Sequence, residues 1–298
     1  MVSSYWDIDR HDRLSCKDFK SNYVNKLRPV LISGFIHNWE AFKKWSPAYF
    51  KKIAPHTKIP VKEFGSSNGI KLRAWTMGQY ADFLENYDKT KEGEKVNSPP
   101  PYCHDVPIFG LVQELVQDIQ PFPLDYLPKW YWHAWWQYFQ FFMGPPNTLT
   151  PLHFDCLLTN NLFFQIIGRK RFTIIPAEDS KYCYRHTWRW FMVDPENPDF
   201  NKYPQYRKAR PIEVIVNPGD ILYLPPGTLH HVRSLDTSIS FNIDWHTKRS
   251  SLRGLAAIFR GMPAQNVYYN FLSVAGLVFN IPSQIVFPFY KSYLNYVS

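Results

Sequence analysis

Short apolar runs dominate the middle of the chain. Between Tyr131 and Trp245, apolar or alternating runs are separated by proline, glycine and asparagine: YFQFFMG, PLHFD, NLFFQII, KRFTIIP, PIEVIVN, DILYLP, HHVRSL and SISFNIDW. Several short strands at this spacing are typical of a β-sandwich or barrel. Residues 178–210 interrupt the series with charges, prolines and aromatic residues, which predicts a long insertion between two strands.

The segments on either side of these strands have other patterns. Before them, the spacing of apolar residues predicts helices over 16–25, 39–50 (with a tight turn) and 76–87, strands over 29–34 and 59–64, and a loop over 88–101. After Ser250 the pattern is helical again. We therefore expect a mainly β fold with an α/β segment over 1–128 that packs on the core, a β-barrel over 129–248 and a helical segment over 249–298.

Composition narrows the class of protein. Of the 298 residues, 45% are hydrophobic and 18% aromatic, which can fill a core and excludes a chain that is disordered throughout. The four cysteines are widely spaced without a C-x-x-C pair, as expected for reduced thiols and not for a disulfide scaffold or a structural zinc site. The polar amino terminus does not resemble a signal peptide. We expect a cytoplasmic protein, or a nuclear one if the source is eukaryotic.

Net charge and hydropathy exclude few further classes of protein. The formal net charge of +9 favours acidic partners or nucleic acid, but the basic residues are dispersed, so a solvated basic surface is the better interpretation. Residues 261–290 carry no charge, yet prolines and amides interrupt them and no window of about 18 apolar residues exists. They predict a pair of buried or interface helices and no stable membrane insertion, with contact at one membrane face as the lesser alternative.

His153 and Asp155, in the run PLHFD, are the first candidates for chemistry. Residues two apart on a strand point to the same face, so one imidazole and one carboxylate would be aimed together into the barrel. A single H-x-D triplet is weak evidence, because ordinary surface strands contain many.

A second imidazole comes from NPGDILYLPPGTLHHV, residues 217–232, where two turns and a buried strand predict a hairpin that returns to the same barrel mouth. Two histidines and one carboxylate on one face, with positions left open, form the ligand set of non-haem Fe(II) oxygenases. Consecutive strand residues face opposite ways, so only one of His230 and His231 can be a ligand.

Lys170 begins the next strand, GRKRFTIIP, among phenylalanine and isoleucine neighbours. A lysine that enters an apolar barrel is costly unless it meets an anion, and a dicarboxylate co-substrate beside the metal would supply one. The alternative is a surface lysine beside Arg169 and Arg171, but the metal ligand set favours the anion site.

The run KWYWHAWWQYFQFF, residues 129–142, is strongly aromatic. Aromatic runs usually pack, so the favoured interpretation is a first barrel strand that covers adjoining helices, and the alternative is a substrate groove. His104 and His133 are interpreted as ordinary structural or surface histidines. Trp245 is a candidate for lining the cleft.

Taken together, the motifs resemble a known family, the JmjC-type 2-oxoglutarate oxygenases of the cupin-like branch, which contains the asparaginyl hydroxylase acting on hypoxia-inducible factor. RPVLISGFIHNWEAFKKW is similar to the family's amino-terminal segment, TPLHFD to its T-P-x-H-x-D motif, GRKRFTIIP to its G-x-K-R strand and PGDILYLPPGTLHHV to its distal-histidine motif. The resemblance spans Phe19 to Trp245. It implies a double-stranded β-helix of jelly-roll or cupin type, with flanking helices.

The resemblance also implies residue roles in two groups. The iron ligands would be His153, Asp155 and His230. The residues that bind 2-oxoglutarate would be Lys170 and Thr150 at its far carboxylate, with Asn161, Asn242 and Tyr102 around it.

These roles imply hydroxylation of a protein or peptide side chain by O2 and 2-oxoglutarate, with release of succinate and CO2. The alternatives within the family are a tRNA or other nucleic-acid hydroxylase, a lysine demethylase and a small-molecule oxygenase. A non-catalytic cupin binding module and a zinc or manganese cupin isomerase are the alternatives outside it. Several members dimerise through terminal helices, so we expect a homodimer through a C-terminal apolar face: Val267, Phe271, Val274, Leu277 and Val278.

Overall fold

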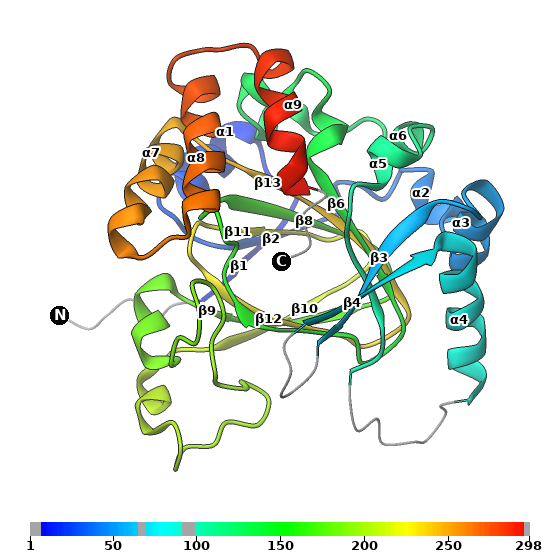
Figure 1. Cartoon of the computed structure of the whole chain (residues 1–298), viewed down its shortest axis with the longest axis horizontal. Coiled ribbons are helices and arrows are strands. Elements are labelled where there is room, and N and C mark those ends of the chain that lie inside the picture. Colours follow the sequence, from blue (N-terminus) through cyan, green and yellow to red (C-terminus); the bar gives the residue numbers. More distant parts are fainter. Residues whose placement is uncertain (1–6, 65–69, 91–98, 295–298) are drawn as a thin grey trace.

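A jelly roll of eight strands forms the centre of the computed structural model, which describes residues 7–64, 70–90 and 99–294 (Figure 1). Four of its strands lie in a larger sheet in the order β11-β8-β13-β6, and four form a smaller sheet in the order β10-β9-β12-β7. This is the predicted double-stranded β-helix. The strands are β6 (Phe139–Gly144), β7 (Leu149–His153), β8 (Asn160–Ile167), β9 (Lys170–Ile175), β10 (Ile212–Val216), β11 (Ile221–Leu224), β12 (Leu229–Ser234) and β13 (Ser238–Trp245).

Strands from the first 128 residues extend the larger sheet at both ends. β1 (Asp9–Asp12) and β2 (Val30–Ser33) join it beside β11, and β5 (Tyr102–Val106), β3 (Lys58–Phe64) and β4 (Ile70–Thr76) follow β6 at the other end. Segment 1–128 is therefore hydrogen-bonded into the barrel sheet rather than only packed on it. The pairing covers strand edges that the jelly roll alone would expose.

The central strands of the larger sheet are buried on both faces. In β13, the side chains that pack toward the helices are apolar: Ile239, Phe241, Ile243 and Trp245. The alternate side chains face the interior between the two sheets and are polar: Ser240, Asn242 and Asp244. The two-residue period of a strand thus separates a hydrophobic core on one face from a polar cleft on the other.

Helices cover the outer face of the larger sheet (Figure 1). The C-terminal helices are α7 (Lys248–Ala256), α8 (Ala264–Leu277) and α9 (Ser283–Leu294), and the earlier ones are α1 (Cys16–Asp18), α2 (Ala41–Lys44), α3 (Pro47–Ile53), α4 (Met77–Thr90), α5 (Ile108–Leu111) and α6 (Leu115–Asp118). α7 begins at Thr247, whose side chain and that of Ser250 cap each other's backbone N–H groups in a capping box. Among the described helices, none has the length and apolar character needed to cross a membrane.

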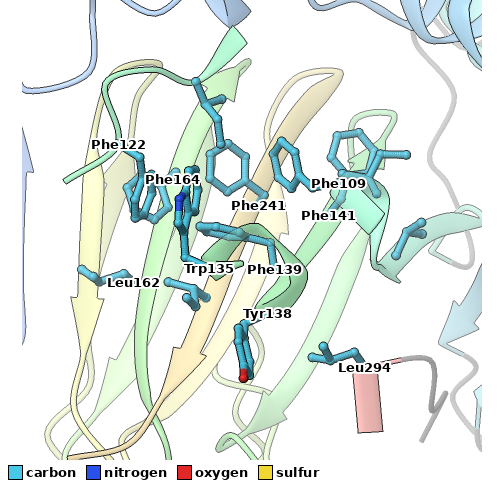
Figure 2. Packing of buried hydrophobic residues seen from close by; sticks show 14 of the residues in the cluster. Phe109, Phe122, Trp135, Tyr138, Phe139, Phe141, Leu162, Phe164, Phe241 and Leu294 are labelled. Atoms are coloured by element: carbon cyan, nitrogen blue, oxygen red, sulfur yellow. The ribbon is translucent and has the colours of Figure 1, made fainter. Parts of the chain in front are cut away.

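An aromatic core fills the space between the larger sheet and these helices (Figure 2). Phe241 lies at its centre and is fully buried. Its ring lies between 5.0 and 6.1 Å, centroid to centroid, from five others: Trp39, Trp45, Phe109, Phe139 and Phe164. These residues come from distant parts of the sequence, so the cluster joins the N-terminal segment to the barrel.

Most predicted elements are present. The helix expected over 16–25 is α1 followed by a π-helical turn (Phe19–Val24), and the one over 39–50 is divided into α2 and α3. The strands over 29–34 and 59–64 and the helix over 76–87 correspond to β2, β3 and α4, and the cysteines are free thiols as predicted. α4 continues to Thr90, and residues 91–98 of the predicted loop lie outside the described residues. β1 and β4 were not predicted, because their side chains are mostly polar or exposed.

The prediction of a strand over 129–142 is wrong for its first ten residues. Two 3₁₀ turns cover Lys129–Tyr131 and Trp135–Tyr138, and Ala134 between them has a left-handed backbone (φ 51°) that breaks an extended run. The rings of Trp135 and Tyr138 are buried among other aromatic side chains (Figure 2). The run therefore packs into the core and does not form an open groove.

The insertion over 178–210 is fixed to the outer side of the smaller sheet. Glu196 accepts hydrogen bonds from Arg171 of β9 at 2.7 Å and from Arg233 of β12 at 2.5 Å. Backbone hydrogen bonds join residues 189–191 of the insertion to β7 and the residue that follows it, along the free edge of the smaller sheet. The insertion thus covers the edge of the strand that carries the predicted metal ligand His153.

The aromatic core predicts the effect of truncating its central ring. Phe241→Ala should lower the free energy of unfolding by about 3–5 kcal/mol, because it removes a fully buried ring and leaves a cavity. Leu111→Ala, at a half-exposed side chain on α5, should change it by less than about 1 kcal/mol. Urea unfolding followed by tryptophan fluorescence measures both values, and equal shifts for the two variants would contradict this account of the core.

Candidate metal centre

All eight predicted site residues line one cleft between the two sheets. They come from six strands and the turn after β7, and they are Tyr102, Thr150, His153, Asp155, Asn161, Lys170, His230 and Asn242. Their side chains point to the inner faces of these strands. Thr150 and His153 both do so although they are three residues apart, because the register of β7 against β12 shifts between them.

The three predicted metal ligands converge on one point. His153 and His230 are directly opposite each other in the β7–β12 pair, and their ring centroids are 4.2 Å apart. Asp155 follows β7, and its Oδ1 lies 3.7 Å from Nε2 of His230. One donor atom from each residue lies within 4.8 Å of the other two. The β-sheet register therefore assembles the ligand set.

Backbone carbonyls orient both imidazoles. Nδ1 of His153 lies 2.8 Å from the carbonyl oxygen of Pro151, and Nδ1 of His230 lies 3.2 Å from that of Thr228. A neutral ring that donates through Nδ1 keeps its lone pair on Nε2 for a metal. Burial, and then the neighbouring His230, lower the pKa of His153 well below its usual range, which keeps this imidazole neutral.

Fe(II) fits this donor set, because two imidazoles and one carboxylate on one face leave the other coordination positions open. Asn161 holds the carboxylate, since its Nδ2 lies 3.3 Å from Oδ2 of Asp155 and donates to Asp244 at 2.9 Å. Burial, followed by the charge of Asp155, raises the pKa of Asp244 well above its usual range. Asn161 therefore joins the metal site to a second buried carboxyl group.

Lys170 is a buried cation, with 1% of its surface exposed. Its Nζ donates to the hydroxyl of Tyr102 at 2.6 Å and to that of Ser240 at 2.9 Å, and lies about 5 Å from the ring centres of Phe142 and Phe163. Among the described residues, no carboxylate pairs with it. Burial lowers the pKa of Lys170 to about 7. An anion bound in the cleft would restore the ordinary charged form.

Two amides and a hydroxyl complete the walls near this cation. Oδ1 of Asn242 and Oδ1 of Asn161 are buried and, among the described residues, accept no hydrogen bond. Oγ1 of Thr150 lies 3.2 Å from Nε2 of His104. Buried polar atoms without partners are rare, so they indicate that a bound molecule completes the site.

His231 faces away from the metal ligands, as strand alternation predicts. Its Nε2 lies 3.8 Å from Oδ1 of Asp194 in the insertion, near Glu196, and burial lowers the pKa of His231 to about 4. Asp194, Glu196 and His231 form a compact group, but Glu196 is already held by Arg171 and Arg233.

The cleft also contains residues that the sequence did not predict there. Ser240 and Asp244 share the inward face of β13 with Asn242, so alternation could have identified them. Tyr293 comes from α9 at the far end of the chain, and no local pattern indicates its position. Trp245 was expected to line the cleft, and this is wrong: it points to the opposite face and is buried in the aromatic core.

His104 was interpreted as an ordinary structural or surface histidine rather than a further metal ligand, and among the described residues it does not join the group of metal-ligand atoms. It is buried in the cleft wall, next to Asp105 and Thr150. Strand alternation could have placed it there, two residues after Tyr102, whereas a one-residue bulge between Cys103 and Val106 brings Asp105 to the same side, and bulges are hard to predict from sequence. His133, in contrast, is exposed, as expected.

A jelly roll that holds two histidines, a carboxylate and a buried lysine in one cleft defines the class of non-haem iron oxygenases that use a 2-oxo acid. The family model described as "Cupin-like domain" matches residues 16–251, so the chain belongs to the cupin-like family of JmjC-type Fe(II)- and 2-oxoglutarate-dependent oxygenases. The match begins at α1 and ends inside α7, so it covers the complete jelly roll and the N-terminal segment after β1.

Three relatives illustrate the similarity. Lysine-specific demethylase 8 of Danio rerio is 30% identical over 248 residues, which cover 78% of this chain and 56% of that protein. JmjC domain-containing protein D of Dictyostelium discoideum is 28% identical over 76% of this chain and 53% of its own length. The 2-oxoglutarate and iron-dependent oxygenase JMJD4 of Gallus gallus is 25% identical, over 80% and 59% respectively. The chain spans about half the length of the curated relatives it matches.

Adjacent histidines on β12 provide a matched test of the metal site. His230→Ala should weaken Mn(II) or Fe(II) binding at least about 100-fold, because it removes one of three donors. His231→Ala, one residue away on the opposite face, should bind the metal as the unmodified protein does. Calorimetric titration of the metal-free protein measures both affinities. Equal loss in both variants, or a loss only in His231→Ala, would contradict the assignment.

Proposed function

We propose that this protein is an Fe(II)- and 2-oxoglutarate-dependent oxygenase that hydroxylates a protein or peptide side chain. Lys170 carries the proposal. A cation that is 1% exposed and lacks a carboxylate partner among the described residues is costly unless an anion binds beside it. It lies in the same cleft as the ligand set of His153, Asp155 and His230. A dicarboxylate that also reaches the metal accounts for both features.

The protein's own residues bind and position the reactants. Lys170 and Tyr102 would bind the far carboxylate of 2-oxoglutarate by charge-assisted hydrogen bonds, and His153, Asp155 and His230 would hold the iron from one side. Phe142 and Phe163 line the pocket between them and exclude water. When bound, the iron with 2-oxoglutarate and O2 supplies the oxidising power, and the reaction releases succinate and CO2.

A protein substrate is supported by the names of the relatives. Lysine-specific demethylase 8 acts, by its name, on lysine. Demethylation of a methylated lysine is therefore the second candidate, since it begins with the same hydroxylation, at an N-methyl carbon.

The activity is tested by product analysis. Purified protein with Fe(II), ascorbate and 2-oxoglutarate should release succinate, and His153→Ala should reduce this to background, because the metal is no longer held. His133→Ala, at an exposed histidine, is the matched control. Mass spectrometry of peptide pools should detect one added oxygen, whereas loss of a methyl group would indicate demethylation.

Other outcomes would change the proposal. An added oxygen in an RNA pool alone would indicate the nucleic-acid alternative. No succinate with any pool, together with no binding of 2-oxoglutarate, would leave a non-catalytic binding module.

We also propose a homodimer through the C-terminal segment, by a surface that shares only Phe271 with the face expected from the sequence. Val274 and Leu277 of that face are buried in the subunit's own core, because α8 packs on α7 and α9. Within the described residues, nine large apolar side chains of this segment are exposed instead: Leu252, Ile258, Phe259, Tyr268, Phe271, Phe279, Ile281, Ile285 and Phe289. Phe259 is 92% exposed. A concentration of this kind typically marks an interaction surface.

Replacing two of these rings with carboxylates tests the dimer. Phe279→Asp combined with Phe289→Asp should shift the protein to a monomer, because the charges would be buried at the interface. Leu111→Asp, at an exposed apolar residue outside this segment, should leave the mass unchanged. Sedimentation velocity measures both, and a monomeric mass for the unmodified protein would refute the proposal.

A further inference from the structure

A chain of buried polar groups runs from β3 through β5 to the co-substrate end of the cleft. Lys62, which is fully buried, donates to Oδ2 of Asp105 at 2.5 Å. The same oxygen lies 2.9 Å from Nδ1 of His104. At the other side of the ring, Nε2 of His104 lies 3.2 Å from Oγ1 of Thr150. The proposed function gives no role to the first three of these residues.

The backbone of β5 is distorted where this chain of groups lies. Between Cys103 and Val106, β5 contains one more residue than the facing segment of β6, and Asp105 has a left-handed backbone with φ 60°. In a regular strand, the adjacent side chains of His104 and Asp105 would point to opposite faces. The bulge lets both line the cleft. Strain of this kind in a non-glycine residue occurs preferentially at functional sites.

The charges decide which ring nitrogen of His104 carries a hydrogen. Burial alone would raise the pKa of Asp105, but His104 and Lys62 lower it well below its usual range, so this carboxylate only accepts hydrogen bonds. It lies 2.9 Å from Nδ1 of His104 without hydrogen-bond alignment, and its charge favours the tautomer with the hydrogen on Nδ1. In a neutral imidazole, Nε2 then has the lone pair and accepts from the hydroxyl of Thr150. The Thr150 proton thus points at His104 and is not available to a carboxylate in the cleft.

Binding of a carboxylate at Thr150 changes this arrangement. If the hydroxyl proton turns toward the anion, Nε2 of His104 is left buried without a donor, which is unfavourable. A proton taken from solvent onto Nε2 resolves this, because Nε2–H can then donate to Oγ1 of Thr150. The anion offsets the added positive charge. No electrons move, and only one proton is transferred, from solvent to His104.

We propose that His104 is a positioning residue, held by Asp105 and Lys62, which takes up a proton as the dicarboxylate binds and thereby turns the Thr150 hydroxyl toward its far carboxylate. This inference rests on the proposed function, since it concerns binding of 2-oxoglutarate. Before binding, burial lowers the pKa of His104 to about 4, so the ring starts neutral.

Other groups also face His104 and influence its protonation. The titratable or charged ones are Lys62 of β3, Tyr102 and Asp105 of β5, His153 of β7 and Lys170 of β9. Lys170 also binds a proton more tightly when an anion arrives, because burial lowers its pKa to about 7 beforehand. The difference in proton uptake between variants at position 104 isolates the contribution of His104, because Lys170 is present in all of them.

The test is calorimetric titration of the Mn(II)-loaded full chain with 2-oxoglutarate in two buffers of different ionisation enthalpy, which counts the protons taken up. The amide of His104→Gln can contact both Asp105 and Thr150 but cannot gain a proton. The unmodified protein should take up close to one proton more than this variant. As the pH rises, the affinity of the unmodified protein for 2-oxoglutarate should therefore fall more steeply than that of the variant. The difference should be up to about tenfold per pH unit.

Three further single variants and one double variant complete the design. His104→Phe keeps a ring between Tyr102, Phe142 and Phe64 but removes the contact with Asp105 and the hydrogen bond to Thr150, so it should bind 2-oxoglutarate about tenfold or more weakly at a similar melting temperature. Thr150→Val should weaken binding equally, and the double variant no further, because the two residues act as one unit. His133→Gln, at an exposed histidine, should match the unmodified protein.

The outcomes separate the two proposals. Equal proton uptake in the unmodified protein and His104→Gln would refute the role of His104 while leaving 2-oxoglutarate binding intact. No binding of 2-oxoglutarate by the unmodified, metal-loaded protein would refute both. If His104→Phe does not fold, the proton count in His104→Gln still decides the question.

Discussion

The central strands of the larger sheet are buried on both faces, so the polar side chains on their inner faces need charged or hydrogen-bonding partners, either from the protein or from a bound molecule. The outer faces supply the hydrophobic energy, since Phe241 and its neighbours join the sheet to the helices. This rigid outer layer holds strands such as β13 in a fixed register. The inner faces then present Ser240, Asn242 and Asp244 to a cleft that the hydrophobic core does not have to fill.

Register, more than any single contact, determines the metal centre. His153 and His230 are 77 residues apart (230 − 153), yet they are direct partners across β7 and β12. A slip of one residue would present His231 in place of His230. The insertion opposes such a slip, because Glu196 holds Arg171 and Arg233 of neighbouring strands and residues 189–191 cover the edge of β7.

The free-energy cost of burying a charged lysine is offset differently at two positions. Lys62 has a permanent partner in Asp105, so its charge is balanced within the protein. Among the described residues, Lys170 donates only to the hydroxyls of Tyr102 and Ser240, and burial lowers its pKa to about 7. An unbalanced cation is unfavourable in the folded protein, but it strengthens the binding of an anion, because ligand binding removes the penalty. The cleft is thus preorganised for a dicarboxylate at some cost in stability.

The sequence by itself determined the strand series, the alternation that aims His153 and Asp155 together, and the motifs around Lys170 and His230, because strand period and turn residues are local properties. Only the tertiary structure decided that the aromatic run packs inward, that Trp245 faces the core and that Tyr293 of α9 reaches the cleft. It also placed Asp105 in the cleft beside His104, since one extra residue in β5 reverses the expected facing of Asp105. A bulge, and packing between distant segments, depend on partners that no local pattern specifies.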